Sequence, residues 1–141
     1  MKTSLGSVLV GLVLTIVVVA IVHADQSTEK AAQKAAESWL SIIDSGEYLE
    51  SWNEAAQIFK QKISLQQWKI SLESVRIPLG NLKSRRLKTA AYTETLPGAP
   101  DGKYVVIQYE TTFDKKKLAI ETITPMMEKD GRWKVSGYFI K

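Results

Sequence analysis

The sequence lacks cysteine altogether, and its only histidine is His23. The chain after this residue therefore has no histidine to activate a serine or cysteine nucleophile. Zinc, copper and iron sites usually depend on nitrogen and sulfur ligands from the same two residue types. The eight glycines are scattered and form no phosphate-binding loop. We therefore expect no metal site and no cofactor.

The excess of positive over negative charge is also small. The 19 basic and 15 acidic residues leave a formal net charge of +4 in a chain of 141 residues. So mild an excess does not indicate a nucleic-acid-binding surface, and we expect no nucleic-acid partner. The missing cysteine further excludes attachment to a membrane through a lipidated cysteine.

Charged residues are absent from the apolar run Leu5 to Val22, which follows Lys2 and ends just before Ala24. A positive start, an apolar middle and a small-residue site are typical of a secretory signal peptide. We favour cleavage between Ala24 and Asp25. The alternative is an uncleaved membrane anchor, because a spanning helix needs about 20 apolar residues.

Both alternatives predict the same organisation for the rest of the chain. Residues 1–24 form a signal-type segment, and residues 25–141 form a single domain that faces outward from the cytoplasm. The domain is long enough to bury a core without disulfide bonds. Membrane contact is expected only through residues 1–24, if they are retained.

The first half of the predicted domain has the periodicity of helices. Apolar residues recur at spacings of three and four over residues 27–45, and Gly46 is a helix stop. A second helix is predicted over residues 48–59. A third begins with a capping box formed by Ser64 and Gln67. The buried stripe and the end of this third helix are predicted at Leu65, Trp68, Leu72 and Val75, and at Pro78 and Gly80.

The second half shows the alternation of strands. The predicted strands are residues 82–95, 104–113, 118–127 and 133–140. The first is polar and irregular, which is typical of an edge strand or of one with a bulge. In the second, Val105, Ile107, Tyr109 and Phe113 point to one face. Short connections make an antiparallel meander, so we predict an α+β fold with N-terminal helices packed on a curved four-stranded antiparallel sheet.

Carboxylates are the residues left for catalysis. Glu110 and Glu121 lie on neighbouring predicted strands, and a glutamate buried against aromatic rings becomes a better acid near neutral pH. Glu110 shares its face with polar residues, which favours a solvated position. Glu121 has apolar neighbours on both faces. We therefore assign no catalytic residue and favour a structural role for Glu121, in a solvated position or an ion pair. Glu121, with Tyr109, is the candidate catalytic pair of the alternative interpretation.

The aromatic residues have two interpretations. The domain contains Trp39, Trp52, Trp68 and Trp133. They would suit a ligand pocket, but at helical spacing beside alanine and leucine we favour a role in the core. Their indole N–H groups then need hydrogen-bond acceptors.

A group of basic residues also has two interpretations. Its members are Arg76, Lys83, Arg85, Arg86, Lys88, Lys115, Lys116 and Lys117. They would suit an anionic surface such as lipid headgroups or an acidic partner. We favour instead the protection of an exposed sheet edge and a hairpin tip from aggregation.

Several segments resemble one protein family. They are Ala35 to Leu40, Ser45 to Tyr48, Ser51-Trp52, Phe59-Lys60, Gln67-Trp68, Val75 to Gly80, Leu96 to Tyr109 and Asp130 to Tyr138. The chain is similar over nearly all of residues 25–141 to an exported bacterial family known as domain of unknown function 4019. The resemblance implies a bacterial envelope protein but no reaction and no catalytic residues. More distantly, the order of helices and sheet is similar to the cystatin-like cone fold of nuclear transport factor 2 and the ketosteroid isomerases.

The expected function is that of a non-enzymatic exported module, in the periplasm or on the outward face of the bacterial inner membrane. Its expected partner is a small apolar ligand or another envelope protein. The alternative is a cofactor-free cone-fold isomerase or hydrolyase that uses Glu121 and Tyr109. A third hypothesis is a structural module that forms a homodimer through the open sheet face. A buried glutamate within hydrogen-bond reach of a tyrosine favours the enzyme, and a filled interior favours binding or structure.

Overall fold

The computed structural model describes the backbone of residues 9–141 and the side chains of residues 26–141. The predicted signal segment and its alternative, an uncleaved anchor, fall within residues 1–24 and so lie outside the described side chains. Within the described part of the chain, no helix is long and apolar enough to cross a membrane.

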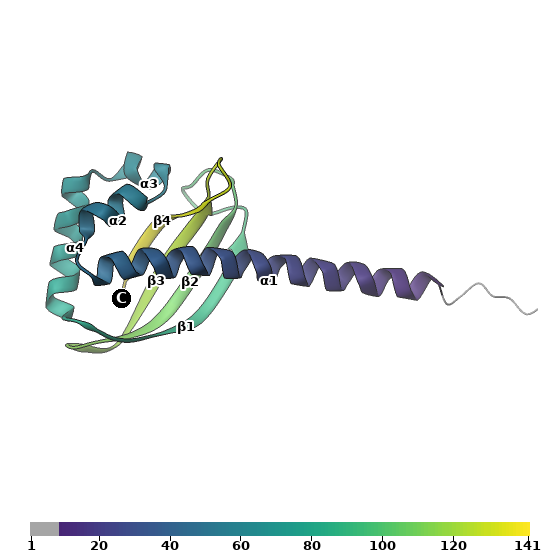
Figure 1. The fold of residues 1–141 in the computed structure, drawn as a ribbon, viewed down its shortest axis with the longest axis horizontal. Helices are drawn as coiled ribbons and strands as arrows, with labels where there is room; N and C mark the ends of the chain where they lie inside the picture. The colour runs from purple at the N-terminus through teal and green to yellow at the C-terminus, as the bar shows by residue number, and fades with distance from the viewer. Residues whose placement is uncertain (1–8) are drawn as a thin grey trace, which may run out of the picture.

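Helix α1 is a single helix from Leu9 to Asp44 and runs far beyond the edge of the sheet (Figure 1). Its last turns form the predicted apolar stripe, and Gly46 follows in the left-handed region at φ +77°. Ala32, Ala36 and Leu40 are fully buried at a spacing of four residues. Because alanine side chains are short, the helix axis lies close to the sheet at these positions.

The single helix predicted over residues 48–59 was wrong. The structure has two short helices, α2 from Tyr48 to Glu54 and α3 from Gln57 to Lys62. Between them, Ala55 and Ala56 are extended, with ψ angles of 162° and 151°. The backbone N–H of Ala56 donates to the carbonyl oxygen of Val135 at 2.8 Å. The break exists because this backbone group pairs with the edge of the sheet rather than with the preceding turn.

Helix α4 runs from Leu65 to Leu79 and begins with the predicted capping box. The Gln67 N–H donates to the Ser64 hydroxyl at 3.2 Å, and the Ser64 N–H donates to the Gln67 side-chain oxygen at 3.1 Å. The prediction that Val75 lies on the buried side was wrong, because Val75 is 44% exposed. Arg76, four residues after Leu72, takes the buried position instead.

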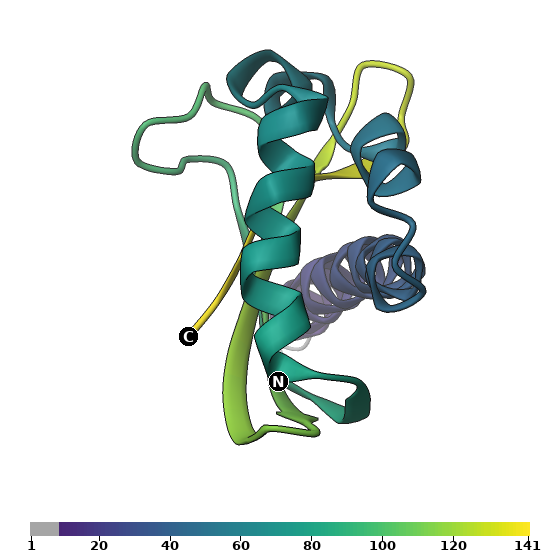
Figure 2. The ribbon, with the colours of Figure 1, turned by 90° about the vertical axis from the view of Figure 1, so that its left-hand side faces the viewer.

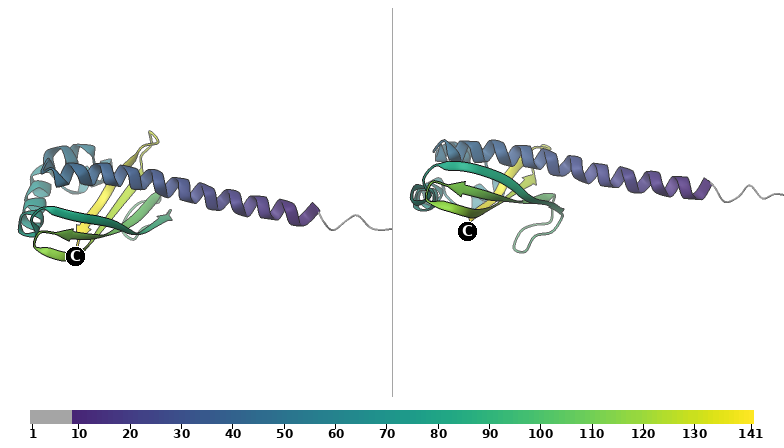
Figure 3. Two further views of the ribbon diagram at one scale, coloured as in Figure 1. Left: turned by 60° about the horizontal axis from the view of Figure 1, so that its bottom comes forward. Right: turned by 90° about the horizontal axis from the view of Figure 1, so that it is seen from below.

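The sheet has four antiparallel strands in the order β1-β2-β3-β4, which confirms the predicted meander. The strands are β1 (Leu82–Thr93), β2 (Tyr104–Phe113), β3 (Lys116–Met127) and β4 (Trp133–Ile140). Strand β1 lies at one edge and carries two register shifts, as its irregular sequence predicted. The four helices cover one face of the sheet (Figure 2), and no helix of the described residues covers the other face (Figure 3).

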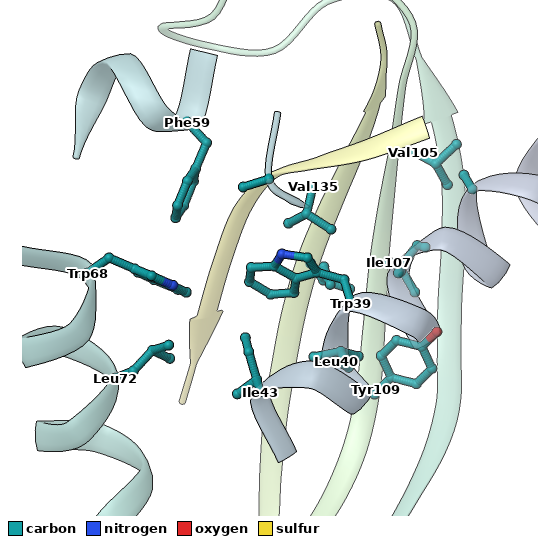
Figure 4. Close-up of a cluster of buried hydrophobic side chains, with 14 residues drawn as sticks. Trp39, Leu40, Ile43, Phe59, Trp68, Leu72, Val105, Ile107, Tyr109 and Val135 are labelled. Atoms are coloured by element: carbon teal, nitrogen blue, oxygen red, sulfur yellow. The ribbon is translucent and has the colours of Figure 1, made fainter. Parts of the chain in front are cut away.

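The core lies between the helices and the covered face of the sheet (Figure 4). The rings of Trp39 and Trp68 have centroids 5.9 Å apart, and Phe59 meets Trp68 edge to face at 4.9 Å. Tyr138 from β4 packs edge to face on Trp39 at 5.5 Å. Pairs of this kind contribute about 0.5–1.5 kcal/mol beyond their burial. The expectation that the tryptophans belong to the core is confirmed for Trp39 and Trp68, while Trp52 and Trp133 are half-buried against it.

Candidate functional site

The candidate residue Glu121 lies in the middle of β3 and is fully buried on the covered face of the sheet. Its carboxylate receives four donors. Oε1 accepts the Arg85 Nε–H at 2.7 Å and the Thr111 hydroxyl at 2.5 Å. Oε2 accepts the Arg85 Nη2–H at 3.2 Å and the hydroxyl of Tyr138. A carboxylate has about four lone-pair positions, so every acceptor position of Glu121 is occupied.

All four strands contribute to this arrangement. Arg85 comes from β1, Thr111 from β2, Glu121 from β3 and Tyr138 from β4. Arg85 and Thr111 face each other across the β1–β2 pair, and Thr111 lies diagonally across from Glu121. Diagonal neighbours on one face are close enough for side chains to meet. The register of the meander therefore brings these side chains together on its covered face.

Arg85 joins the sheet to the end of helix α1. Beyond its two bonds to Glu121, it donates through Nη1 to Asp44 Oδ2 at 2.7 Å and through Nη2 to Asp44 Oδ1 at 3.0 Å. The planar guanidinium thus binds two carboxylates in bidentate fashion, a geometry that lysine does not provide. Burial alone would lower the pKa of Arg85, but the bonds to Asp44 and Glu121 outweigh it and raise that pKa.

A second arginine, Arg76 of α4, completes the cluster. Its Nη2 donates to Asp44 Oδ1 at 2.8 Å, and its guanidinium carbon lies 5.0 Å from the centroid of the Phe113 ring. Its Nε and Nη1 atoms are buried without a hydrogen-bond partner among the described residues. Two arginines and two carboxylates balance the formal charge, which is what allows Arg76 and Glu121 to be buried and Asp44 and Arg85 to be half-buried. We call Asp44, Arg76, Arg85, Thr111, Glu121 and Tyr138 the Glu121 cluster.

Besides Arg85, two other members of the cluster have pKa values shifted from their ordinary values. Burial alone would raise the pKa of Asp44, but hydrogen bonds from Arg85 and Arg76 outweigh it, and the pKa is lowered. Burial, followed by the neighbouring Glu121 carboxylate, raises the pKa of the Tyr138 hydroxyl well above its usual value. At neutral pH, Asp44 is therefore ionised and Tyr138 is a neutral donor.

The structure places the other candidate, Tyr109, differently from the prediction. Tyr109 and Glu121 are opposite each other in the β2–β3 register. The Tyr109 hydroxyl, however, donates to the Glu37 carboxylate on α1 at 3.4 Å. Burial, followed by Glu37, raises the pKa of Tyr109. The tyrosine that donates to Glu121 is Tyr138, and Tyr109 donates to Glu37 instead.

Sequence reasoning missed five members of the cluster: Asp44, Arg76, Arg85, Thr111 and Tyr138. Two local signals pointed to some of them. Thr111 lies between Tyr109 and Phe113 on the face predicted to be buried, and Arg76 continues the Trp68–Leu72 spacing. Asp44, Arg85 and Tyr138 carry no comparable signal, because their partners lie 17 to 41 residues away in the chain.

The expectation that Arg76 and Arg85 of the basic group help to protect an exposed sheet edge was wrong, since both are largely buried in ion pairs. Other members of that group are exposed. Lys83 pairs with Asp114 at 3.1 Å, and Arg86 pairs with Glu110 across the β1–β2 edge. These two positions agree with the protection of an edge strand.

The Glu121 cluster is poorly suited to acid–base catalysis. A general base needs a free lone pair within reach of a substrate proton, and Glu121 has neither a free acceptor position nor exposed surface. Asp44 and Arg76 border a cleft of about 310 Å³ beside the end of α1. Within the described residues, no group of three acidic or histidine side chains is arranged to hold a metal ion.

A family model described as a protein of unknown function, DUF4019, matches residues 35–138. The match covers well over half of the chain, so the chain belongs to this family. No curated protein matches it. Family membership brings no biochemical role.

Proposed function

We propose that this member of the DUF4019 family is a non-enzymatic exported module that binds a protein of the bacterial envelope. The observation that carries the proposal is the full occupancy of the Glu121 carboxylate. A tyrosine does lie within hydrogen-bond reach of this buried glutamate, which is the arrangement expected of an enzyme. The two bonds from Arg85 distinguish the cluster from a catalytic pair, because they hold Glu121 as an ion-pair member.

The filled interior supports a protein partner over a small apolar ligand. Trp39, Trp68 and Tyr138 pack ring against ring where a cone-shaped fold would hold a ligand. Their polar groups are also bonded within the chain: both buried indoles donate to Ser51. The surfaces left for recognition are therefore on the outside of the domain. The cystatin-like cone remains our proposal for the name of the fold.

The proposed location rests on the N-terminal sequence. The run from Leu5 to Val22, with Ala24 at its end, supports export to the periplasm. We propose that residues 1–24 are removed as a signal peptide. If they are retained, the domain is held on the outward face of the inner membrane by this segment alone. Neither arrangement brings the domain into contact with nucleic acid.

The substitution Glu121→Gln tests whether the cluster is structural. It keeps the shape of the side chain but leaves Arg85 with one carboxylate instead of two. Removing one partner of a buried ion pair costs about 3–5 kcal/mol, so we expect a clear fall in the free energy of urea unfolding. The matched control is Glu110→Gln, whose partner Arg86 is exposed, and we expect a change of less than about 1 kcal/mol.

The enzyme hypothesis predicts the opposite result. A strained catalytic acid is relieved by neutralisation, so Glu121→Gln would then leave the domain as stable as before or make it more stable. Native mass spectrometry of the full chain purified from its own envelope is an independent measurement. The mass of the bare polypeptide agrees with a protein-binding module, whereas a retained small molecule would contradict it.

A further inference from the structure

Helices α2 and α4 enclose a cleft of about 640 Å³ at one end of the molecule. We call it the acidic groove. Its lining includes three carboxylates, Glu47, Glu50 and Glu73, against a single basic residue, Lys69. This local excess of negative charge occurs in a chain whose net charge is +4. The groove is therefore electrostatically distinct from the protein as a whole.

The folded chain makes little use of these side chains. Glu47 occupies the N-cap position of α2 but makes no capping hydrogen bond through its side chain. Glu73 and Lys69 form an ion pair at 3.9 Å with both side chains well exposed, a contact that contributes little to stability. Leu49, between the two N-terminal glutamates, is 56% exposed. An exposed leucine beside Glu47 and Glu50, which form no ion pair with another described residue, suits a partner that is basic and has an apolar side chain.

The same chain carries a segment of that chemistry. The turn between β2 and β3 leads into Lys115, Lys116, Lys117 and Leu118, which we call the lysine tip. None of the three lysines forms an ion pair with another described residue, and Leu118 is 63% exposed. Asp114, the one acidic residue of the turn, is already held by Lys83 and by the backbone N–H of Asn81.

Helix α4 connects the two features. The acidic groove lies beside its first turns, and the lysine tip is bonded to its end, where the Lys115 N–H donates to the Leu79 carbonyl oxygen at 3.0 Å. The two features are thus roughly 20 Å apart along the helix. They lie at the end of the molecule opposite the N-terminal half of α1 (Figures 1 and 3). An association through this end does not involve the N-terminal half of α1.

A surface that carries both a basic and an acidic feature is self-complementary under a twofold axis. We propose that two copies of the chain pair through this end, each inserting its lysine tip into the acidic groove of the other. Leu118 of one copy then meets Leu49 of its partner, and the lysines face the carboxylates. This inference names one protein partner for the proposed binding module and rests on that function.

Cysteine cross-linking tests the contact directly, because the chain has no cysteine of its own. Two full-length chains with different affinity tags are expressed together and exported by their own N-terminal segment. One carries Leu49→Cys and the other Leu118→Cys. We expect a disulfide-linked pair that contains both tags after mild oxidation. The matched control replaces Leu118→Cys by Ala91→Cys, an exposed position on β1 away from the tip, and should give no mixed pair.

Charge reversal tests the chemistry of the contact. Glu47→Lys with Glu50→Lys, or Lys115→Glu with Lys117→Glu, should each raise the dimer dissociation constant at least roughly tenfold in analytical ultracentrifugation. All four changes in one chain should restore the dimer, since the charges are then exchanged. Added salt should weaken the wild-type dimer, because the charged contacts are exposed. Circular dichroism of each variant verifies that α2 is intact.

Three results would overturn the proposal: a monomer at high protein concentration, a dimer that neither reversal weakens, or reversals that do not rescue each other. A groove that instead captures a basic segment of a different protein would give the first result. The outcome is separate from that of the Glu121 experiment. A monomer with a strongly destabilised Glu121→Gln variant would refute the self-association and leave the non-enzymatic binding module standing.

Discussion

Trp68 donates its indole N–H to the hydroxyl oxygen of Ser51 at 2.9 Å, which links helix α4 to helix α2. Ser51 is fully buried. Its backbone oxygen accepts the indole N–H of Trp39 at 2.7 Å, and its hydroxyl donates to the Tyr48 carbonyl oxygen at 2.7 Å. One small residue therefore satisfies the polar groups of the two most buried tryptophans, which lets the aromatic core close without a polar cleft.

The substitution Ser51→Ala should destabilise the domain. It leaves the Trp68 N–H buried without an acceptor, which costs about 1–3 kcal/mol. The measurement is the free energy of urea unfolding, followed by tryptophan fluorescence. Ser74→Ala is the matched control, since Ser74 is exposed on α4 and bonds only to a local carbonyl oxygen; its effect should stay within about 0.5 kcal/mol. Equal effects of the two changes would show that the Ser51 hydroxyl has no special role.

Two glycines with nearly the same backbone conformation should respond differently to alanine. Gly46 and Gly80 have φ angles of +77° and +75°. An added methyl group at Gly46 meets nothing within 4 Å, whereas at Gly80 it would lie 2.7 Å from the Asp114 Cβ. Gly46→Ala should therefore cost only about 1–2 kcal/mol for the left-handed conformation. Gly80→Ala should cost more, because the β2–β3 turn must also shift.

Thermal unfolding of both alanine variants checks this comparison. The melting temperature should fall further for Gly80→Ala than for Gly46→Ala. Asp114→Ala in the Gly80→Ala background tests the nature of the contact. It cannot remove the Cβ atom, but it removes the carboxylate oxygen that lies 3.0 Å from the added methyl group. If Gly46→Ala were the more harmful change, the close packing of the turn against α4 would be refuted.

Tyr138 and Tyr109 provide a second matched pair. The Tyr138 hydroxyl binds the buried Glu121 carboxylate, whereas the Tyr109 hydroxyl makes a long bond of 3.4 Å to Glu37, an exposed residue. A hydrogen bond to a charged group contributes about 1.5–3 kcal/mol, so Tyr138→Phe should lower the free energy of unfolding by about that amount. Tyr109→Phe should change it by less than about 1 kcal/mol. If Tyr109→Phe lowered the free energy of unfolding more than Tyr138→Phe, the bond from Tyr138 to Glu121 would not be the stronger of the two.

Much of the fold was predictable because its determinants are local. The apolar spacing before Gly46, the capping box of Ser64 and Gln67, and the alternation of β2 each depend on residues within one element. The order of the strands followed from short connections between consecutive strands. The break at Ala55 and Ala56 was not predictable, because it depends on a hydrogen bond to Val135, about 80 residues away. The local sequence is compatible with a continuous helix, but the contact with Val135 prevails over that local preference.

The Glu121 cluster was predictable only in part for a related reason. A glutamate with apolar neighbours is conspicuous within a strand, and Glu121 was identified in this way. A buried arginine has no such signature, since the same residue type protects exposed edges. Arg85 and Arg86 are adjacent on β1, yet one binds two buried carboxylates and the other is exposed. The alternation of β1 decides which of the two arginines points to the covered face of the sheet. The register shifts of β1 make that alternation hard to read from the sequence.

Asp44 should make the domain sensitive to acid in a specific range. Its pKa is lowered in the folded state from an ordinary value of 3.8, because the bonds from Arg85 and Arg76 outweigh the effect of burial. The unfolded chain therefore takes up a proton at Asp44 at a higher pH than the folded chain does. The stability that the ionised carboxylate provides is complete above that ordinary value and is lost as the pH falls through the folded pKa.

The variant Asp44→Asn isolates this contribution. At neutral pH it should be less stable than wild type, because Arg76 and Arg85 lose a shared carboxylate. The difference between the two free energies of urea unfolding should begin to shrink as the pH is lowered from about 5 to about 3, since wild-type Asp44 starts to lose its advantage as the pH falls toward and below the ordinary value of 3.8. Asp130→Asn is the control. The pKa of Asp130 is also lowered, first by its hydrogen bonds with Arg132, but both side chains are exposed, so salt should largely abolish its effect. The Asp44 effect should persist in salt because its partners are largely buried. A difference between wild type and Asp44→Asn that stayed constant across this range would show that the Asp44 carboxylate is not what links α1 to the sheet and α4.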